Sequence, residues 1–185
     1  MTEGVPLFLA PMSGVTDVAY RLLAREAGAD FTATEFTAAS GLSRQDAKSW
    51  AKVETHPREK PFIPQIFGGI EDEMVETVRL LSKGADVVDL NFGCPAPKVT
   101  KTCAGAAMMA LPDSLVGMVE RCIEASEVPV SVKMRLGTRS EKINVLEIAE
   151  RCAALGVERI CVHGRTLKQK YRGTADWDMI AKVVD

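Results

Sequence analysis

Short apolar runs alternate along the chain with segments of helical periodicity. Six runs of five or six residues predict strands, at residues 6–10, 31–36, 62–67, 86–91, 130–135 and 159–163. Most of their residues are apolar, without a strict alternation of apolar and polar positions. That composition is typical of strands buried on both faces of a parallel sheet.

Three segments between these strands place apolar residues on one face of a helix. The three faces are Met74, Val78 and Leu81; Leu115, Val119 and Cys122; and Val145, Ile148 and Cys152. The expected N-caps or first-turn acids are Asp17, Asp113 and Asn144. A glycine in the left-handed conformation can end a helix, and the candidates before a strand are Gly28, Gly84 and Gly156. Helix, glycine, strand and loop form a repeating βα unit.

The number of units predicts the architecture. A (β/α)8 TIM barrel has eight strands in about 250 residues, and this chain has six predicted strands in 185 residues. Its last residues, 181–185, continue a helical pattern. We expect one α/β domain over residues 1–185, an incomplete TIM barrel with about six of its eight βα units.

Composition excludes several classes of protein. Lys and Arg number 23 and Asp and Glu 25, a net charge of −2, so a basic surface for nucleic acid would need segregated charge. No apolar run is long enough to span a membrane, and the N-terminus lacks the features of a signal peptide. The five cysteines form no C-x-x-C pair, which disfavours zinc sites and disulfide frameworks. A reducing cytoplasm is the simplest location.

Polar or unusual residues stand at the predicted end of every strand. In order they are Pro11 and Met12, Glu35, Gln65, Asn91 and Cys94, Lys133 and Arg135, and His163 and Arg165. Active sites of TIM barrels lie at the C-terminal ends of the strands. We therefore expect these residues to form one polar mouth above an apolar barrel interior.

Cys94 lies between Gly93 and Pro95, where a regular helix or central strand is excluded. Its loop thiol is either a proton donor or a small buried side chain, and position alone does not separate the two. Cys122, Cys152 and Cys161 have apolar neighbours and are expected in the core. Cys103 is assigned no role.

Lys133 and Arg135 alternate with apolar residues, so both cations face one side of a buried strand and need an anionic partner. That partner is a bound flavin, whose N1–C2=O edge gains negative charge on reduction, or a structural carboxylate such as Glu35. His163 at a strand end is by itself equally compatible with a core role.

Residues 164–173 contain four cations and no acid. These are Arg165, Lys168, Lys170 and Arg172, and Lys98 and Lys101 follow Cys94 in the same way. Such a rim would present a basic surface to RNA, on which Tyr171 could stack against a base.

Taken together, these motifs resemble the tRNA-dihydrouridine synthases over nearly the whole chain. The matching segments are residues 10–17 (APMSGVTD), 91–99 (NFGCPAPKV), 105–106, 132–137 (VKMRLG), 163–166 (HGRT) and 171–177 with Tyr171, Gly173 and Trp177. Their order and spacing make the resemblance specific.

The resemblance implies reduction of the C5–C6 double bond of selected tRNA uridines, with FMN as cofactor, NADPH as reductant and no metal. Flavin N5 would deliver hydride to C6, and Cys94 would protonate C5. The residues implied to contact FMN are Pro11, Met12, Ser13, Gln65, Lys133 and His163. Those implied to bind the substrate are Asn91, Arg135 and Arg165.

The chain departs from the family pattern at its end. The glycine-rich phosphate loops after strands 7 and 8 and the C-terminal helical tRNA-binding domain are expected to be absent. One alternative is another FMN barrel, of the dihydroorotate dehydrogenase type. Another is an inactive fragment that only binds RNA or a partner chain. Exposed barrel edges also predict self-association.

Overall fold

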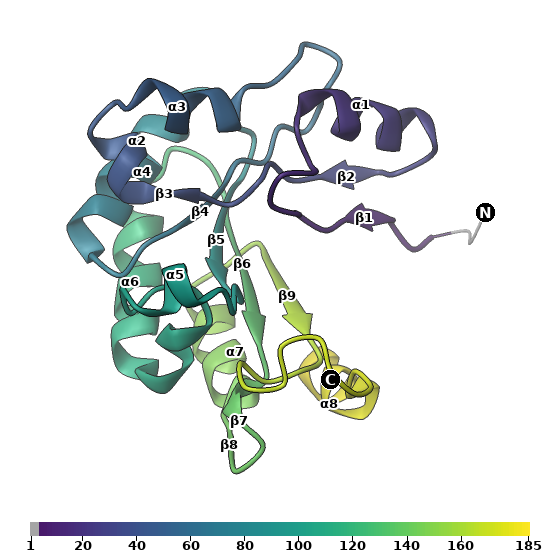
Figure 1. The fold of residues 1–185 in the computed structure, drawn as a ribbon, viewed down its shortest axis with the longest axis vertical. Coiled ribbons are helices and arrows are strands. Elements are labelled where there is room, and N and C mark those ends of the chain that lie inside the picture. The colour runs from purple at the N-terminus through teal and green to yellow at the C-terminus, as the bar shows by residue number, and fades with distance from the viewer. Residues whose placement is uncertain (1–3) are drawn as a thin grey trace.

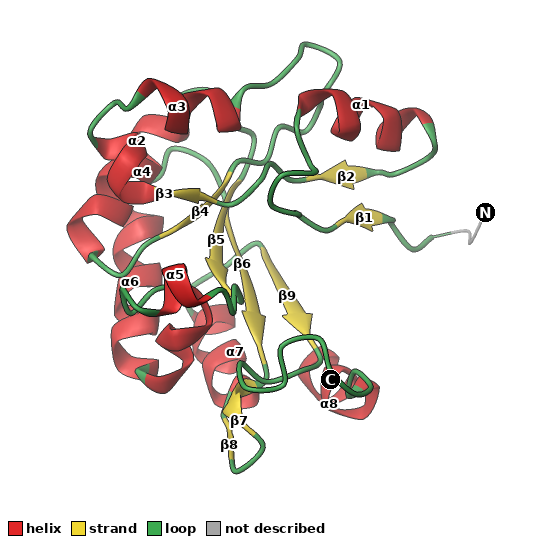
Figure 2. Ribbon diagram, viewed as in Figure 1, coloured by secondary structure: helices red, strands yellow, loops and turns green. Residues whose placement is uncertain are grey.

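Parallel strands follow one another in sequence order around an arc, with helices on its outer side (Figures 1 and 2). The computed structural model describes residues 4–185. The strands of the arc are β1 (Phe8–Leu9), β2 (Phe31–Thr32), β3 (Thr37–Ala38), β4 (Gln65–Phe67), β5 (Val88–Phe92), β6 (Val130–Arg135) and β9 (Arg159–His163). β1 pairs with β2, and β3, β4, β5, β6 and β9 form a second sheet in that order; every pair is parallel.

The second predicted strand, 31–36, is not continuous, and this expectation was wrong in detail. Only Phe31–Thr32 of it forms a strand, β2, which pairs with β1. The next strand, β3, begins beyond the predicted segment at Thr37 and pairs with β4. Between them the backbone N–H of Thr34 donates to the carbonyl of Ile63 at 3.0 Å, and the Thr34 hydroxyl donates to the carbonyl of Glu35. Residues 31–38 thus pair with β1 at their start and with β4 at their end. Because β2 and β3 together occupy one place in the arc, the arc still has six strand positions.

The predicted amphipathic helices are present, with their expected faces buried. They are α4 (Glu71–Leu81), α6 (Pro112–Ala125) and α7 (Val145–Ala154). The remaining helices are α1 (Val18–Glu26), α2 (Ala39–Ser43), α3 (Ala47–Trp50), α5 (Pro97–Thr100), α8 (Trp177–Val184) and the 3-10 segments η1 (Ala51–Val53) and η2 (Gly105–Ala110). β7 (Gly137–Arg139) and β8 (Lys142–Ile143) form an antiparallel hairpin, which the sequence pattern did not predict.

The predicted helix ends are confirmed in most cases. Asp17 caps α1 by accepting from the N–H of Tyr20 at 2.8 Å, and Gly28 and Gly156 have φ of 104° and 82°. Gly84 is different, because α4 ends earlier and residues 82–84 continue as a turn whose N–H groups bond back to the carbonyls of α4. Asn144 is the N-cap residue of α7 as predicted, but its side chain donates to the carbonyl of Met109 and makes no capping hydrogen bond.

The main hydrophobic core fills the space between the sheet and its helices. Val88, Leu90 and Phe92 of β5 alternate along the strand and are fully buried in it with side chains of α4 and α6. The other side chains of the same strands point to the concave side of the arc. There Arg159 of β9 stacks over the ring of Phe8 in β1, 4.2 Å from its centroid, which shows how far the arc curls.

The arc is not closed within residues 4–185. In this part of the chain, β1 and β9 each pair with a strand on one side only. The arrangement is that of an incomplete TIM barrel, as the strand count predicts. No helix among the described residues is long and apolar enough to cross a membrane, and no group of three or more potential metal ligands occurs there.

Candidate active site

The concave side of the arc carries polar side chains in layers set by strand register. Gln65, Asp89, Ser131 and Arg159 are successive partners across β4, β5, β6 and β9. Two residues further along, Asn91 pairs with Lys133 and Lys133 with Cys161, and then Arg135 pairs with His163. Alternate residues of a strand share one face, so these layers are stacked. The expected apolar interior beneath the mouth is therefore wrong, because its lower layer is polar.

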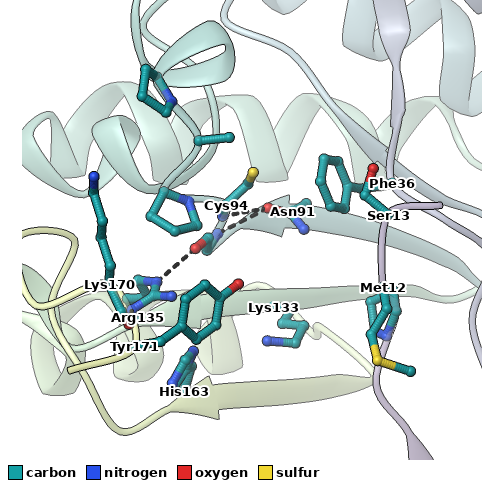
Figure 3. A pocket seen from close by; sticks show the side chains of 15 residues that line it. Met12, Ser13, Phe36, Asn91, Cys94, Lys133, Arg135, His163, Lys170 and Tyr171 are labelled. Atoms are coloured by element: carbon teal, nitrogen blue, oxygen red, sulfur yellow. Dashed lines mark hydrogen bonds between the residues drawn. The ribbon is translucent and has the colours of Figure 1, made fainter. Parts of the chain in front are cut away.

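A cavity of about 470 Å3 opens at the C-terminal ends of these strands (Figure 3). Eight of the ten predicted site residues line it: Pro11, Met12, Ser13, Asn91, Cys94, Lys133, Arg135 and His163. Phe36, Lys170 and Tyr171 also line it, while no Asp or Glu of residues 4–185 does. The cavity is therefore a cationic pocket with partly apolar walls, the usual form of a small-molecule site.

Gln65 and Arg165 do not line the cavity. Gln65 is fully buried one layer below it, where its side chain contacts Asp89 and Asn91. Arg165 donates to the carbonyls of Arg172 and Gly173, and its third nitrogen lies 3.1 Å from Nε2 of His163. Arg165 thus braces the loop after β9.

A chain of hydrogen bonds leads from the lower polar layer to the Cys94 loop. Nε2 of Gln65 donates to Asp89 at 2.6 Å, and Oε1 of Gln65 accepts from Nδ2 of Asn91 at 2.8 Å. Oδ1 of Asn91 then accepts from the backbone N–H groups of Gly93 and Cys94, at 3.0 and 2.9 Å. All three polar side chains in the chain are nearly inaccessible to solvent.

Cys94 is a buried residue on the cavity wall, 6% exposed. It belongs to a small apolar cluster with Val99 and Ala104. Burial raises the pKa of its thiol, and this effect outweighs the opposing influences of the backbone N–H of Ala96 and of Arg135, Lys98 and Lys133. The thiol therefore stays protonated at neutral pH. Cys94 is thus both buried, as the second sequence interpretation expects, and in reach of the cavity, as a proton donor would have to be.

Lys133 extends from β6 into the cavity (Figure 3). Among residues 4–185, neither Lys133 nor Arg135 forms an ion pair with a carboxylate. Glu35, the suggested structural partner, instead accepts a hydrogen bond from the N–H of Gly14. The alternative of an ion pair with Glu35 is therefore wrong, and the cavity holds an uncompensated cation.

Arg135 is 1% exposed and holds two loops together. Its Nε donates to the carbonyl of Gly93 at 2.7 Å, and NH1 donates to the carbonyls of Thr166 and Lys170. Its guanidinium also lies over the ring of Tyr171, 5.5 Å from the centroid. The Cys94 loop and the loop after β9 are thus fixed to one buried cation.

His163 lies at the end of β9 with cations around it. Burial lowers the pKa of its imidazole to about 4, and Arg135, Lys133 and Arg165 add to the effect. The ring is therefore neutral at pH 7. Because the guanidinium of Arg165 can only donate, Nε2 of His163 accepts and its proton resides on Nδ1.

Comparison with known proteins decides the family. The family model for dihydrouridine synthase matches residues 8–185, which is nearly all of the chain. The chain belongs to the dihydrouridine synthase family.

Relatives in this family carry corresponding names. A probable tRNA-dihydrouridine synthase of Rhizobium leguminosarum bv. phaseoli is 41% identical over 95% of this chain and 55% of its own length. One from Rhodobacter capsulatus is 38% identical over 96% of this chain and 56% of its own. The tRNA-dihydrouridine synthase B of Klebsiella pneumoniae is 34% identical, with 96% and 56% covered. The chain thus spans about half the length of the curated relatives it matches.

Three features of the cavity and its surroundings were missed by sequence reasoning. Phe36 lines the cavity, although it was predicted only as the last residue of a strand. Asp89 and Ser131 were treated only as members of mostly apolar strands. Each lies two residues before a predicted site residue, Asn91 or Lys133, and this spacing could have shown that they share its face of the strand. Arg159 was seen only as the first residue of a strand.

A second hollow, of about 480 Å3, adjoins the cavity of this family member. Pro95, Pro97 and Lys170 line both spaces. Its other walls include Arg139 of the unpredicted hairpin and Lys168, and no acidic residue in the described part of the chain lines it. Of the cations predicted for a basic rim, Lys168 and Lys170 thus lie beside these two spaces, together with Arg139, which was not predicted.

Proposed function

We propose that this chain is the catalytic part of a tRNA-dihydrouridine synthase, which reduces selected uridines in tRNA to 5,6-dihydrouridine with FMN as cofactor and NADPH as reductant. The observation that carries the proposal is the acid-free cationic cavity in which Asn91, Cys94 and Lys133 meet. It combines a proton donor, a hydrogen-bond donor and a positive charge within one space.

The cavity residues suit the ring system of FMN. Pro11, Met12 and Ser13 supply one wall, and Lys133 supplies an unpaired cation for the ring edge that becomes anionic on reduction. His163 is neutral and offers a polar contact without adding charge. Bound FMN would supply the two-electron reduction chemistry. Gln65 lies below the cavity, so we propose that it acts through Asn91.

Cys94 would provide the proton for C5 of uracil. A thiol whose pKa is raised above its usual range holds its proton at physiological pH. A positioned acid of this kind contributes about 10²–10⁴-fold to rate. Asn91 would bind the uracil edge, and Arg135 would hold the Cys94 loop in place while Tyr171 covers the base.

The basic rim would guide the RNA. Arg139, Lys168 and Lys170 lie along the second hollow, where a phosphodiester backbone leaving the cavity would meet three cations. A uridine inside a folded tRNA must be extruded to enter the cavity. We place this reaction in the cytoplasm, where five free cysteines would remain reduced.

The decisive experiment combines flavin absorption with product analysis. We expect the purified protein to bind FMN and, with NADPH, to convert uridine in unmodified tRNA to a nucleoside heavier by two hydrogens. Turnover of free dihydroorotate without tRNA turnover would indicate the dihydroorotate dehydrogenase type instead. Binding of RNA without flavin binding or reduction would indicate a non-enzymatic fragment.

A further inference from the structure

We propose that Asp89 is a positioning residue that fixes the hydrogen-bond polarity of Asn91, so that Asn91 meets the substrate only as a donor to a carbonyl oxygen. The inference rests on the proposed function, in which Asn91 contacts the uracil edge. It adds a residue outside the cavity and a rule for how the base is recognised.

The polarity follows from the two ends of the hydrogen-bond chain. At the lower end, Asp89 accepts from Gln65, from the hydroxyl of Ser131 and from Arg159, whose nitrogen lies 3.3 Å away. At the upper end, the backbone N–H groups of Gly93 and Cys94 can only donate. Only one orientation of the two amides between these ends satisfies every contact.

The role of Ser131 supports the same assignment. Its Oγ accepts from Arg159 at 3.1 Å, so its own proton is directed to Asp89. Every partner of Asp89 is therefore a donor, which is the environment of a carboxylate that only accepts. The Gln65 amide must then turn Nε2 toward Asp89 and Oε1 toward Asn91.

The consequence for Asn91 is a reduced set of free contacts. Its Oδ1 already accepts two hydrogen bonds, and one N–H of Nδ2 is used by Gln65. An amide has two donors and an acceptor oxygen with two lone pairs. What remains is one N–H, which complements O2 or O4 of uracil and cannot accept from N3–H.

The test substitutes Asp89 and Gln65, which are neighbours in this hydrogen-bond network, singly and together. In Asp89→Asn, Arg159 still donates at the lower end and the loop N–H groups still donate at the upper end, but the carboxylate that only accepts is lost. The side-chain amides of Gln65 and Asn91 then have no single orientation that satisfies every contact. In Gln65→Glu, two carboxylates face each other. The double variant Asp89→Asn with Gln65→Glu restores the polarity, because Asn at 89 donates to Glu at 65, whose other oxygen accepts from Asn91.

We expect each single variant to lower kcat for dihydrouridine formation about 10²-fold, the usual result of misplacing a reacting group. The double variant should recover most of the activity, and reduction of the bound flavin by NADPH should stay unchanged throughout. Ser131→Ala is the matched control, because it removes a contact of Asp89 outside the path to Asn91 and should change kcat little.

A pH profile separates positioning from a structural role. The like charge of Asp89 and burial would raise the pKa of Glu at 65. Once protonated, that group donates to Asp89 and accepts from Asn91, as Gln65 does. Activity of Gln65→Glu should therefore rise as pH falls, relative to wild type, and the double variant should lack this rise.

Hydrogen exchange of the Gly93 and Cys94 amides gives a reading that needs no turnover. Exchange should accelerate in both single variants at neutral pH and return toward the wild-type rate in the double variant. Unchanged exchange and activity in both single variants, with wild type active, would overturn the role of Asp89 alone. Failure of the double variant to recover either property would also overturn it. An inactive wild type would instead refute the proposed function.

Discussion

Gly105 lies against the backbone of Cys94, and a Cβ at residue 105 would stand 2.8 Å from the Cys94 carbonyl oxygen and 3.2 Å from the Cys94 Cβ. The same glycine has φ of 58°, in the left-handed region. The N–H of the next residue, Ala106, donates to that carbonyl at 3.0 Å. The backbone that follows α5 thus returns to pack directly against Cys94, the proposed acid.

Gly105→Ala should therefore lower the free energy of unfolding by roughly 2–5 kcal/mol, the sum of left-handed strain and overpacking. Denaturant unfolding measures the loss. Gly117→Ala is the matched control, because Gly117 lies inside α6 with nothing within 4 Å of the added atom, and it should be neutral or stabilising. Equal effects of the two substitutions would refute the role assigned to the close approach.

Cys94→Ala should reduce dihydrouridine formation by about 10²–10⁴-fold, because a positioned acid is lost. Flavin binding and flavin reduction by NADPH should remain. The buried, protonated thiol of Cys94 should also react with iodoacetamide far more slowly than exposed Cys103, which mass spectrometry of the alkylated protein would show. Full product formation in Cys94→Ala would remove this residue from the chemistry.

Lys133→Met should weaken FMN binding about 10–100-fold, the equivalent of losing one hydrogen bond to a charged group. Fluorescence titration measures the affinity. Since no ion-pair partner of Lys133 exists among residues 4–185, the flavin-free protein should be equally or more stable after the substitution. Lys48→Met, at an exposed position of α3, serves as the control. A marked loss of stability with unchanged FMN affinity would assign Lys133 to the scaffold.

His163 should remain neutral well below pH 6, because its pKa is about 4 in the folded protein. An unfolded histidine titrates near 6.5, so the unfolded state binds more protons between these values. The free energy of unfolding should therefore fall as pH drops from about 6.5 to 4. The chain has only two histidines, so NMR titration resolves them, with His163→Gln for assignment. Lys133→Met should raise the pKa of His163. A midpoint near 6.5 would contradict this environment.

The sequence predicted those parts of the fold that depend on local periodicity. β6 and β9 have the predicted bounds. α4 shows its predicted face, because Met74, Val78 and Leu81 are buried in the core. The division between β2 and β3 was not predictable, since it depends on the hydrogen bond from Thr34 to Ile63, 29 residues away. The pattern of apolar and polar residues within a segment carries no information about a contact so distant in sequence.

The candidate site likewise has one part that local sequence predicts and another part that depends on contacts between distant residues. The Gly93-Cys94-Pro95 sequence places the thiol on a loop without any tertiary information, and the structure confirms that position. The network of Gln65, Asp89 and Arg159 needed the register of three strand pairs before its members could be recognised as neighbours. The buried ion pair of Arg21 and Glu59 was missed for a similar reason, since its partners are 38 residues apart.

Self-association is the last prediction, and it concerns the outer strands of the arc. Within residues 4–185, β1 and β9 have no strand on their outer sides, so their edges expose unpaired N–H and C=O groups. Apolar side chains are exposed close to both edges, among them Leu7 at 61% and Trp177 at 71%. A free parallel edge beside apolar surface favours pairing with a second copy.

We expect the 185-residue chain to associate with increasing concentration in sedimentation velocity. Leu7→Lys, which places a charge beside β1, should shift this equilibrium toward monomer. Leu23→Lys is the matched control, because Leu23 is equally exposed, at 63%, on α1. A monomer at all concentrations, or equal effects of the two lysines, would show that the edge of β1 does not drive association.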